Sequence, residues 1–384
     1  MKVAQITTTL EGGAGIAAIR LSEALDSVGV NSEIVSQRGS ESKTNFNSKL
    51  TTLFQSSLVQ STPSLVTTFS RTTIKDEQLE AFDLLHFHSI YNLIGVRRIA
   101  ILAERKPIFI TLHDQRLLTG GCHYSGSCVN FMSSCSHCPQ VRKAFWSFVE
   151  KEKVLVNNLL ENPRIHFVSP SNWLAEMAEG ILKHKKRIYV VKNPIPQMPI
   201  ISREEAQKKA NIQSNKFVIG FVSFHLSNPL KGLHDLINAL NVLPLEIKNQ
   251  IHLVLVGKSR GDIGKLDISK SQIDTSLQNI KVNPYSLMDL LVVPSRQDNS
   301  PNVIGEALMS GVRVLGSNVG GIPELMMENG CSTLDTMSPR IFANEILKEM
   351  GNKYSRVELA TKASEKFSYK KIGTEVKKLY EEVL

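Results

Sequence analysis

The chain has 384 residues, and its 45 Lys and Arg against 36 Asp and Glu give a formal net charge of +9. Apolar residues make up 42% and charged residues 21%, an ordinary balance that excludes a disordered or fibrous chain. No apolar run reaches the roughly 18 residues that a membrane span needs. The first ten residues also lack the features of a signal peptide, so we expect a cytoplasmic protein of two or three domains.

Strands and helices are predicted to alternate through the first half of the chain. Residues 2–9 have the pattern of a buried strand, followed by a glycine-rich turn and a helix that ends near Gly29. Further apolar strands are expected at 32–36, 83–88, 107–112, 164–169 and 188–191. Between positions 40 and 73 nearly half of the side chains are Ser or Thr, and this segment is predicted to be ordered but irregular.

The alternation restarts after the proline-rich stretch 193–200, which is the best linker candidate. Strands are expected at 216–224, 251–256, 290–294 and 313–316, and helices at 232–243 and 302–310. The sequence therefore predicts an α/β protein of two Rossmann-like, doubly wound domains, residues 1–192 and 193–365, facing a central cleft. Residues 366–384 form an amphipathic helix.

A glycine-rich turn, Gly12-Gly13-Ala14-Gly15, separates the first strand from the first helix. Small residues let a ligand approach the backbone, and a helix N-terminus offers unpaired N–H groups to a phosphate. The alternative is a tight turn that binds nothing.

Two carboxylates eight positions apart, Asp298 and Glu306, lie across a turn and into a predicted helix. Such a pair would grip a polyol, because carboxylates accept hydrogen bonds from vicinal hydroxyls. The N–H groups of Asn302 and Val303 would meet a phosphate at the helix start. The alternative is an Asp that caps the helix and a surface Glu.

These motifs resemble those of GT-B glycosyltransferases of family 4. Residues 298–324 resemble that family's E-x7-E signature and its GGIPE turn, and residues 220–233 resemble its Arg-x5-Lys-Gly diphosphate-binding loop. The glycine-rich turn, residues 111–114 and residues 191–194 also occur in the expected order, so the resemblance covers nearly the whole chain. Asp replaces the first Glu of the signature at position 298, and His225 replaces the arginine.

The resemblance implies a role for each matching residue. The donor-binding residues would be Gly13, Gly15, His225, Lys231, Asp298, Asn302, Val303 and Glu306. The catalytic set would be His113 beside the reacting sugar, Lys231 on the leaving diphosphate and Asp298 on the sugar hydroxyls. The acceptor side would contain His86, His88 and Asp114, although a strand histidine is more often a packed core residue.

The resemblance also implies the reaction. A sugar would pass, with retention of configuration, from a UDP- or GDP-sugar to a saccharide or lipid-linked glycan in bacterial surface polysaccharide biosynthesis. The N-terminal domain would bind the acceptor and the C-terminal domain the nucleotide-sugar, and residues 366–384 would cross back to the N-terminal domain. A lysine and helix N-termini stabilise charge on a leaving diphosphate, so no cofactor is expected for catalysis.

Basic residues are concentrated in 141–192, including Lys183, Lys185, Lys186 and Arg187, and the nearby aromatic residues are Phe145, Trp146 and Phe148. This composition favours peripheral contact with an anionic membrane surface. The alternative is a solvated helix face with aromatics in the core. The charge lacks the aromatic interleaving of a nucleic-acid-binding face, so no nucleic-acid partner is expected.

Four of the five cysteines lie close together in the loop 120–140, as Cys122-x5-Cys128-x6-Cys135-x2-Cys138. In a cytosolic protein, a cluster that contains a C-x2-C pair indicates a structural zinc ion with a closed shell of four thiolates. The alternatives are reduced free thiols, an iron–sulfur cluster or disulfides. The loop also resembles one in some bacterial exopolysaccharide and O-antigen transferases.

Two other functions stay open. One is another GT-B nucleotide-sugar enzyme such as an epimerase, and the other is a non-enzymatic, zinc-bearing nucleic-acid-binding protein. The substitution Glu306→Ala separates the transferase from the nucleic-acid-binding protein, because it should abolish sugar transfer and leave nucleic-acid binding intact.

Overall fold

The computed structural model describes residues 1–36, 74–91, 93–182, 188–198, 202–258, 266, 268–273, 283–326 and 331–384. The Ser/Thr-rich segment 40–73 and the basic residues 183–187 therefore lie outside the described residues. The chain divides into two compact units. Unit 1 is Met1–Pro194 with Tyr369–Leu384, and unit 2 is Ile195–Ser368.

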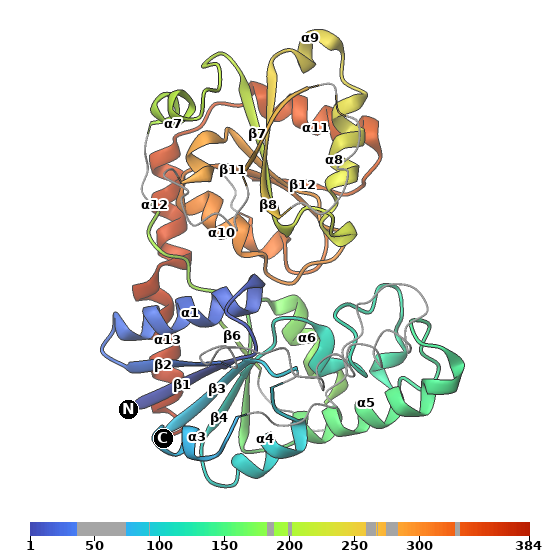
Figure 1. Ribbon diagram of the computed structural model, residues 1–384, viewed down its shortest axis with the longest axis vertical. Coiled ribbons are helices and arrows are strands. Elements are labelled where there is room, and N and C mark those ends of the chain that lie inside the picture. Colours follow the sequence, from blue (N-terminus) through green and yellow to red (C-terminus); the bar gives the residue numbers. More distant parts are fainter. Residues whose placement is uncertain are drawn as a thin grey trace. The chain divides into compact units, whose positions relative to one another are not determined.

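Unit 1 is built on a parallel six-stranded sheet in the order β2-β1-β3-β4-β5-β6 (Figure 1). Its strands are β1 (Lys2–Thr7), β2 (Asn31–Ser36), β3 (Leu84–Ser89), β4 (Ile108–Thr111), β5 (Ile165–Ser169) and β6 (Ile188–Val190). The central strands are buried on both faces, as expected for a parallel sheet covered by helices. The strand order reverses at β1, so the carboxyl ends of β1 and β3 form the topological switch point where ligands of such sheets bind.

Helices cover both faces of the unit 1 sheet. One face packs on α1 (Gly12–Asp26) and α13 (Tyr369–Glu381), which lie side by side in Figure 1. The other face packs on α3 (Glu77–Glu80), α4 (Val96–Leu102), α5 (Trp146–Leu160) and α6 (Asn172–Ile181). At Gly373 an added Cβ would lie 2.3 Å from the Ala24 carbonyl oxygen, so the missing side chain lets α13 approach α1 closely.

Unit 2 repeats the architecture with the parallel order β12-β11-β10-β7-β8-β9. Its strands are β7 (Phe217–His225), β8 (Ile251–Lys258), β9 (Ser269–Ile273), β10 (Leu290–Val293), β11 (Arg313–Ser317) and β12 (Cys331–Leu334). The helices on one face are α7 (Arg203–Lys209), α10 (Asn302–Met309) and α12 (Arg356–Phe367). Those on the other are α8 (Leu233–Asn241) and α11 (Pro339–Gly351), and the short α9 (Leu245–Lys248) follows α8. The order reverses at β7, so the switch point lies between β7 and β10.

The two doubly wound parallel units confirm the predicted α/β fold class. The edge strand β9 was not predicted, because its sequence Ser-Lys-Ser-Gln-Ile has no apolar run and most of it is exposed. Ser171 caps α6 as expected, since its side chain accepts the N–H of Leu174 at 3.1 Å.

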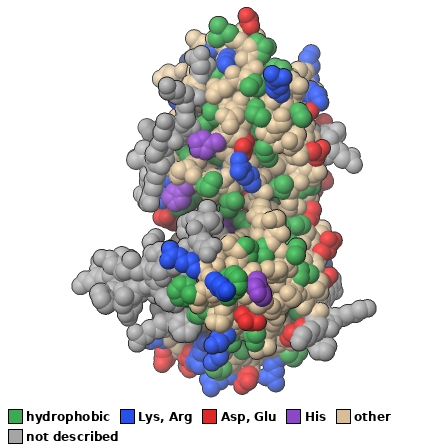
Figure 2. Space-filling model, turned by 90° about the vertical axis from the view of Figure 1, so that its right-hand side faces the viewer, with side chains coloured by type: hydrophobic (Ala, Val, Ile, Leu, Met, Phe, Trp, Pro, Cys, Tyr) green, Lys and Arg blue, Asp and Glu red, His purple; other side chains and the backbone are tan. Residues whose placement is uncertain are grey.

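None of the helices in the described part of the chain is long and apolar enough to cross a bilayer. On the face drawn in Figure 2, basic and acidic side chains are interspersed, and hydrophobic side chains are scattered among them.

Candidate functional site

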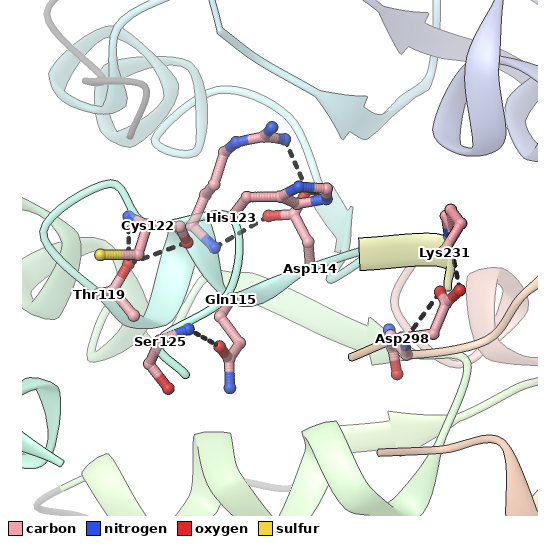
Figure 3. A network of polar contacts seen from close by, with 10 residues as sticks. Asp114, Gln115, Thr119, Cys122, His123, Ser125, Lys231 and Asp298 are labelled. Carbon is pink, nitrogen blue, oxygen red and sulfur yellow. Dashed lines mark hydrogen bonds and ion pairs between the residues drawn. The ribbon is translucent and has the colours of Figure 1, made fainter. Parts of the chain in front are cut away.

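An ion pair between Lys231 and Asp298 marks the switch point of unit 2 (Figure 3). The Lys231 Nζ lies 2.5 Å from Oδ2 of Asp298, whose side chain is only 7% exposed. Oδ2 also accepts the Ser295 hydroxyl at 3.2 Å, and Oδ1 accepts the Asn299 N–H at 3.1 Å. A carboxylate buried to this degree needs such partners, and together they hold a lysine ammonium at the carboxyl end of the sheet.

Two glycines let the backbone bring this pair together. Gly232, next to the lysine, has φ +76, and an added Cβ would lie 1.9 Å from the Pro294 carbonyl oxygen. Gly320 has φ +58, and its Cβ would lie 1.9 Å from the carbonyl oxygen of Asp298. The Lys-Gly and Gly-Gly-Ile-Pro motifs are therefore also demanded by the fold, because only glycine fits both the conformation and the space.

Glu306 lies on α10 and has a partner of its own. The Tyr285 hydroxyl donates a hydrogen bond to its Oε2. Tyr285 is buried in the short helix η6 (Pro284–Leu287), and sequence reasoning did not find it, because no spacing rule connects it to a residue 21 positions later. The helix α10 itself begins at Asn302, followed by Val303, and Pro301 before it supplies no side-chain cap. The two predicted carboxylates thus have different hydrogen-bond donors, Tyr285 for Glu306 and Lys231, Ser295 and Asn299 for Asp298.

His225 is the last residue of β7, six positions before Lys231. Its Nδ1 is buried and has no hydrogen-bond partner in the described part of the chain. The ring packs edge-on against Phe224, with 4.6 Å between the ring centroids. A buried polar atom without a partner is costly, and at the end of a central strand it is a natural contact for a ligand.

The glycine-rich turn of unit 1 falls in the first turn of α1, and its glycines differ in what surrounds them. At Gly15 an added Cβ would lie 2.2 Å from the Thr9 carbonyl oxygen, so the chain's own backbone occupies the space. At Gly13 a Cβ would meet nothing within 4 Å. Of the two predicted contacts, only Gly13 has open space above it.

His86 lies in the core of unit 1. Its Nδ1 is 2.6 Å from the Tyr380 hydroxyl on α13, and its Nε2 is 2.7 Å from the Thr111 hydroxyl. Burial, with a smaller contribution from His113, lowers the pKa of His86 to about 3. Because both ring nitrogens are bonded within the chain and the side chain is fully buried, His86 has a packing role in place of the predicted acceptor-side role.

His88 connects Gln5 to His113 at the switch point of unit 1. Its Nε2 lies 2.8 Å from the Gln5 Oε1, and its Nδ1 lies 3.0 Å from the His113 Nε2. The Gln5 amide nitrogen donates to the Tyr380 hydroxyl at 3.3 Å, so its oxygen accepts the N–H of His88. A neutral His88 then offers a bare Nδ1, and His113 must donate its Nε2–H.

Burial keeps these rings neutral. It lowers the pKa of His113 to about 4, against the opposing effect of Asp114. It also lowers the pKa of His88 well below its usual range, and His86 and His113 add to this. Uncharged rings agree with the hydrogen bonds from His88 to Gln5 and from His113 to His88. Near pH 7, His113 is therefore a neutral hydrogen-bonding group and not a cation.

Asp114 joins His113 to the cysteine-containing loop. Its Oδ1 accepts the Arg116 N–H at 2.9 Å, and its Oδ2 lies 2.6 Å from the Arg116 Nη1 and 3.7 Å from the His123 Nε2. The carboxylate also caps the short helix η2 (Gln115–Leu118). The charge of Asp114 is thus compensated chiefly by Arg116, two positions later in the chain.

The four cysteines of the loop line one small cavity and are all free thiols: Cys122, Cys128, Cys135 and Cys138. The Cys138 sulfur is hydrogen-bonded to the Cys122 thiol and to the N–H groups of Gln140 and Val141. The first of these contacts is the largest, and together they lower the pKa of Cys138 to about 6. As they stand, no three His, Cys, Asp or Glu side chains within the described ranges form a ready metal shell.

The aromatic residues beside the loop pack within unit 1. The Trp146 Nε1–H is shared between the carbonyl oxygens of Cys138 and Val141, each at 3.1 Å. Phe145 and Phe148 are partly buried against the same cluster. These contacts bury part of each aromatic side chain, and the predicted contact of these residues with a membrane surface stays a prediction.

Comparison with known proteins gives a family match within unit 2. Residues 216–352 match the family model described as "Glycosyl transferases group 1". A curated relative, the putative colanic acid biosynthesis glycosyl transferase WcaC of Escherichia coli (strain K12), is 24% identical over 266 residues. The match covers 65% of this chain and 64% of WcaC, so the chain spans less than two thirds of that relative.

Solved structures match over almost the full length. Sucrose-phosphate synthase from Thermosynechococcus elongatus has a TM-score of 0.68 at 16% identity, covering 100% of this chain and 99% of that one. Anabaena Alr3699/HepE, solved with UDP and glucose, has a TM-score of 0.63 at 15% identity and covers 99% of both chains. Together with the sheet topology, these similarities confirm the predicted GT-B fold and the resemblance to GT-B glycosyltransferases.

Proposed function

We propose that this chain, whose residues 216–352 match the group 1 glycosyl transferase model, transfers a sugar from a nucleotide-diphosphate-sugar to a saccharide or lipid-linked glycan acceptor. The observation that carries the proposal is the charge arrangement at the switch point of unit 2. Lys231, between β7 and α8, is paired with the buried carboxylate of Asp298 in the connection before α10, and Glu306 projects from that helix.

The donor chemistry follows from these groups. Breaking the bond between sugar and diphosphate produces an oxocarbenium-like state and a growing negative charge on the leaving group. Lys231 would leave Asp298 for the diphosphate, and the N-terminus of α10 would add its partial positive charge. The buried Nδ1 of His225 would gain a phosphate or sugar oxygen as its partner.

Carboxylates would hold the hydroxyls of the donor. Once Lys231 moves, Asp298 is an acceptor for hydroxyls of the transferred sugar. Glu306, oriented by the Tyr285 hydroxyl, would accept the vicinal hydroxyls of the ribose.

Unit 1 would bind the acceptor, and its uncharged histidines would form hydrogen bonds with sugar hydroxyls. His113, fixed as the Nε2–H tautomer by His88, would hydrogen-bond a sugar hydroxyl without carrying charge. The transfer would retain the anomeric configuration, with the leaving phosphate as the base. Lys231 and the helix N-terminus would provide the positive charge for this step, so activity should not depend on added Mg²⁺ or Mn²⁺.

The biological setting is part of the proposal. The name of the relative WcaC includes colanic acid biosynthesis, which favours a role in bacterial surface polysaccharide biosynthesis. HepE has been solved with UDP, with UDP and glucose, and with UDP-glucose. UDP and UDP-glucose are therefore the first donors to test.

The test is the shift in thermal unfolding with UDP, GDP, ADP and CMP. A ligand that binds only the folded state stabilises it by about 2.7 kcal/mol at a hundredfold excess over its Kd. One nucleotide should raise the midpoint of the wild type and not of Glu306→Ala. The matched control is Glu205→Ala, an exposed glutamate of the same unit, which should respond as the wild type does. Equal responses of all three proteins, or no response to any nucleotide, would contradict the proposal.

A further inference from the structure

We propose that Cys122, Cys128, Cys135 and Cys138 bind one structural zinc ion, and that the buried Lys153 provides the countercharge of this centre. The inference does not depend on the transferase activity. It rests on the arrangement of the cysteine loop around its cavity and on a buried lysine that is hydrogen-bonded to Leu118, shortly before that loop.

The first observation is that all four thiols converge on one cavity. They come from four separate positions of the loop 120–140, and Cys122, Cys135 and Cys138 form a buried cluster with Val141 and Val149. Cys128 completes the lining of the same small cavity. Four sulfur ligands around a metal-sized space are the donor set that Zn²⁺ prefers in closed, tetrahedral sites.

The second observation is that backbone N–H groups point at the sulfur atoms. Cys138 accepts from Gln140 and Val141, and Cys135 accepts from the N–H of Gly120. N–H donors stabilise a thiolate, which is the form that binds a metal. Cys135 also has φ +57, a conformation that few residues with a side chain adopt, so the backbone there is held by its surroundings.

The third observation is Lys153 on α5. Its side chain is 1% exposed, and its Nζ donates to the Leu118 carbonyl oxygen at 2.7 Å. The ion pairs of the described residues join it to no carboxylate, and burial lowers its pKa to about 8 against an opposing effect of Cys135. A buried ammonium without an anion is costly, so the site calls for negative charge beside it.

The charges of the proposed centre balance as follows. Zn²⁺ with four thiolates carries a net charge of −2, and each thiol releases its proton to solvent on binding. The Lys153 ammonium offsets one of these charges, and the N–H groups directed at Cys135 and Cys138 offset part of the other. A free-thiol cluster would leave Lys153 without this compensation.

The sulfur atoms must turn to close the shell, because in the described ranges they do not yet form one. The shell would therefore close on metal binding, around the cavity that the four residues already line. Such a centre would fix the conformation of the loop 120–140, which is hydrogen-bonded to the segment that begins at Asp114. The loop is tied there by the Gln115 N–H to the His123 carbonyl at 3.1 Å and by the Ser125 N–H to the Gln115 Oε1 at 2.5 Å, the second of which is drawn in Figure 3.

The experiment measures metal content and thiol reactivity in the full chain purified under reducing conditions with added zinc. We expect one zinc per chain, and one fast-reacting thiol, that of Cys331. Single substitutions of the four loop cysteines by serine should lose the zinc, and Lys153→Met should lower zinc affinity at least tenfold. The matched control is Cys331→Ser, in β12 of unit 2, which should keep one zinc.

A second measurement keeps the proposal falsifiable if the serine variants fail to fold. Cobalt added to chelator-stripped wild type should give the charge-transfer and d–d bands of a tetrahedral thiolate site. Five reactive thiols with no bound metal, a mass lower by two hydrogens per disulfide, or iron with a visible cluster spectrum would each overturn the proposal. The UDP-induced thermal shift, measured on the stripped protein, tests unit 2 separately, so the two proposals can fail independently.

Discussion

The two units of this protein place polar residues at equivalent positions of similar sheets but treat charge in opposite ways. At the switch point of unit 2, the partly exposed Lys231 forms an ion pair with the buried Asp298. At the switch point of unit 1, His86, His88 and His113 are held neutral in a hydrogen-bonded chain. The shared topology therefore determines where polar residues gather in each unit. The side chains at the strand ends determine whether that place is charged or neutral.

The physical reason for the difference lies in the partners available. In unit 2 the buried carboxylate of Asp298 is paired with the ammonium group of Lys231. In unit 1 the hydrogen bonds of His86 and His88 go to neutral partners, namely hydroxyls, an amide and another histidine, so burial removes their charge. An anionic diphosphate suits the first environment and a sugar suits the second.

The largest effect is expected from Lys231→Met, which removes the charge of the unit 2 site. We expect kcat for sugar transfer to fall by about 10²–10³-fold, the scale seen when one stabilising donor is removed from a transition state. Steady-state assays with UDP-glucose, or with the donor identified by thermal shift, would measure this. The matched control is Lys209→Met, an exposed lysine paired with Glu205 at 2.7 Å, which should leave kcat unchanged.

The same variant leaves Asp298 buried without its cation and should also lower the unfolding midpoint. The double variant Lys231→Met/Asp298→Asn should recover stability but not activity. Activity that returns with stability would show that the lysine is only structural.

The pH dependence of stability should distinguish the neutral site from the charged one. The pKa values of His86 and His113 fall from 6.5 to about 3 and about 4 in the folded chain, so below pH 6.5 the unfolded chain binds more protons. Stability is then lost as the pH falls, by about 2 kcal/mol for His86 alone between pH 7 and pH 5. Urea unfolding followed by tryptophan fluorescence reports unit 1, because Trp146 and Trp173 are the two tryptophans. An unfolding free energy that is equal at both pH values would show that the histidines are not buried as neutral groups.

A smaller effect is expected from Gln5→Leu, which removes the acceptor of the His88 N–H. His113 would lose its enforced tautomer, and we expect kcat to fall about tenfold while the thermal shift with nucleotide stays as in wild type. The ¹⁵N signals of His113 should move from the Nε2–H pattern to a mixture. Thr111→Val, which removes a hydrogen bond of His86 and none of His88, is the control and should leave those signals unchanged. If the His113 spectrum of Gln5→Leu were unaltered, the hydrogen bonds from Gln5 through His88 would not determine the His113 tautomer.

The smallest change, in the free energy of unfolding, is expected when one helix cap in each unit is removed. Ser171 caps α6 and is fully buried, and Ser355 caps α12 and is exposed. Replacing Ser171 by Ala should cost about 1–2 kcal/mol of unfolding free energy, and replacing Ser355 should cost less, because water can satisfy the exposed N–H. Urea unfolding of both variants gives the comparison, and equal costs would contradict this reasoning.

Much of the fold was predictable, because it depends on neighbours along the chain. Short apolar runs separated by helical periodicity identified most strands of both sheets, and Ser171 was recognised as a cap from local order alone. The edge strand β9 and the packing of α13 on α1 were beyond this reasoning. The first has a polar sequence, and the second joins two helices from opposite ends of the chain.

The site divides in the same way. The order of residues along the chain was enough to identify Lys231, Asp298, Glu306 and the four loop cysteines as candidates. Their partners became known only from the folded chain: Tyr285 on Glu306, Tyr380 on His86 across 294 positions, and Lys153 on the Leu118 carbonyl before the cysteine loop. Spacing along a chain constrains contacts within one or two turns, whereas burial, pKa and hydrogen-bond direction depend on atoms that only packing brings together.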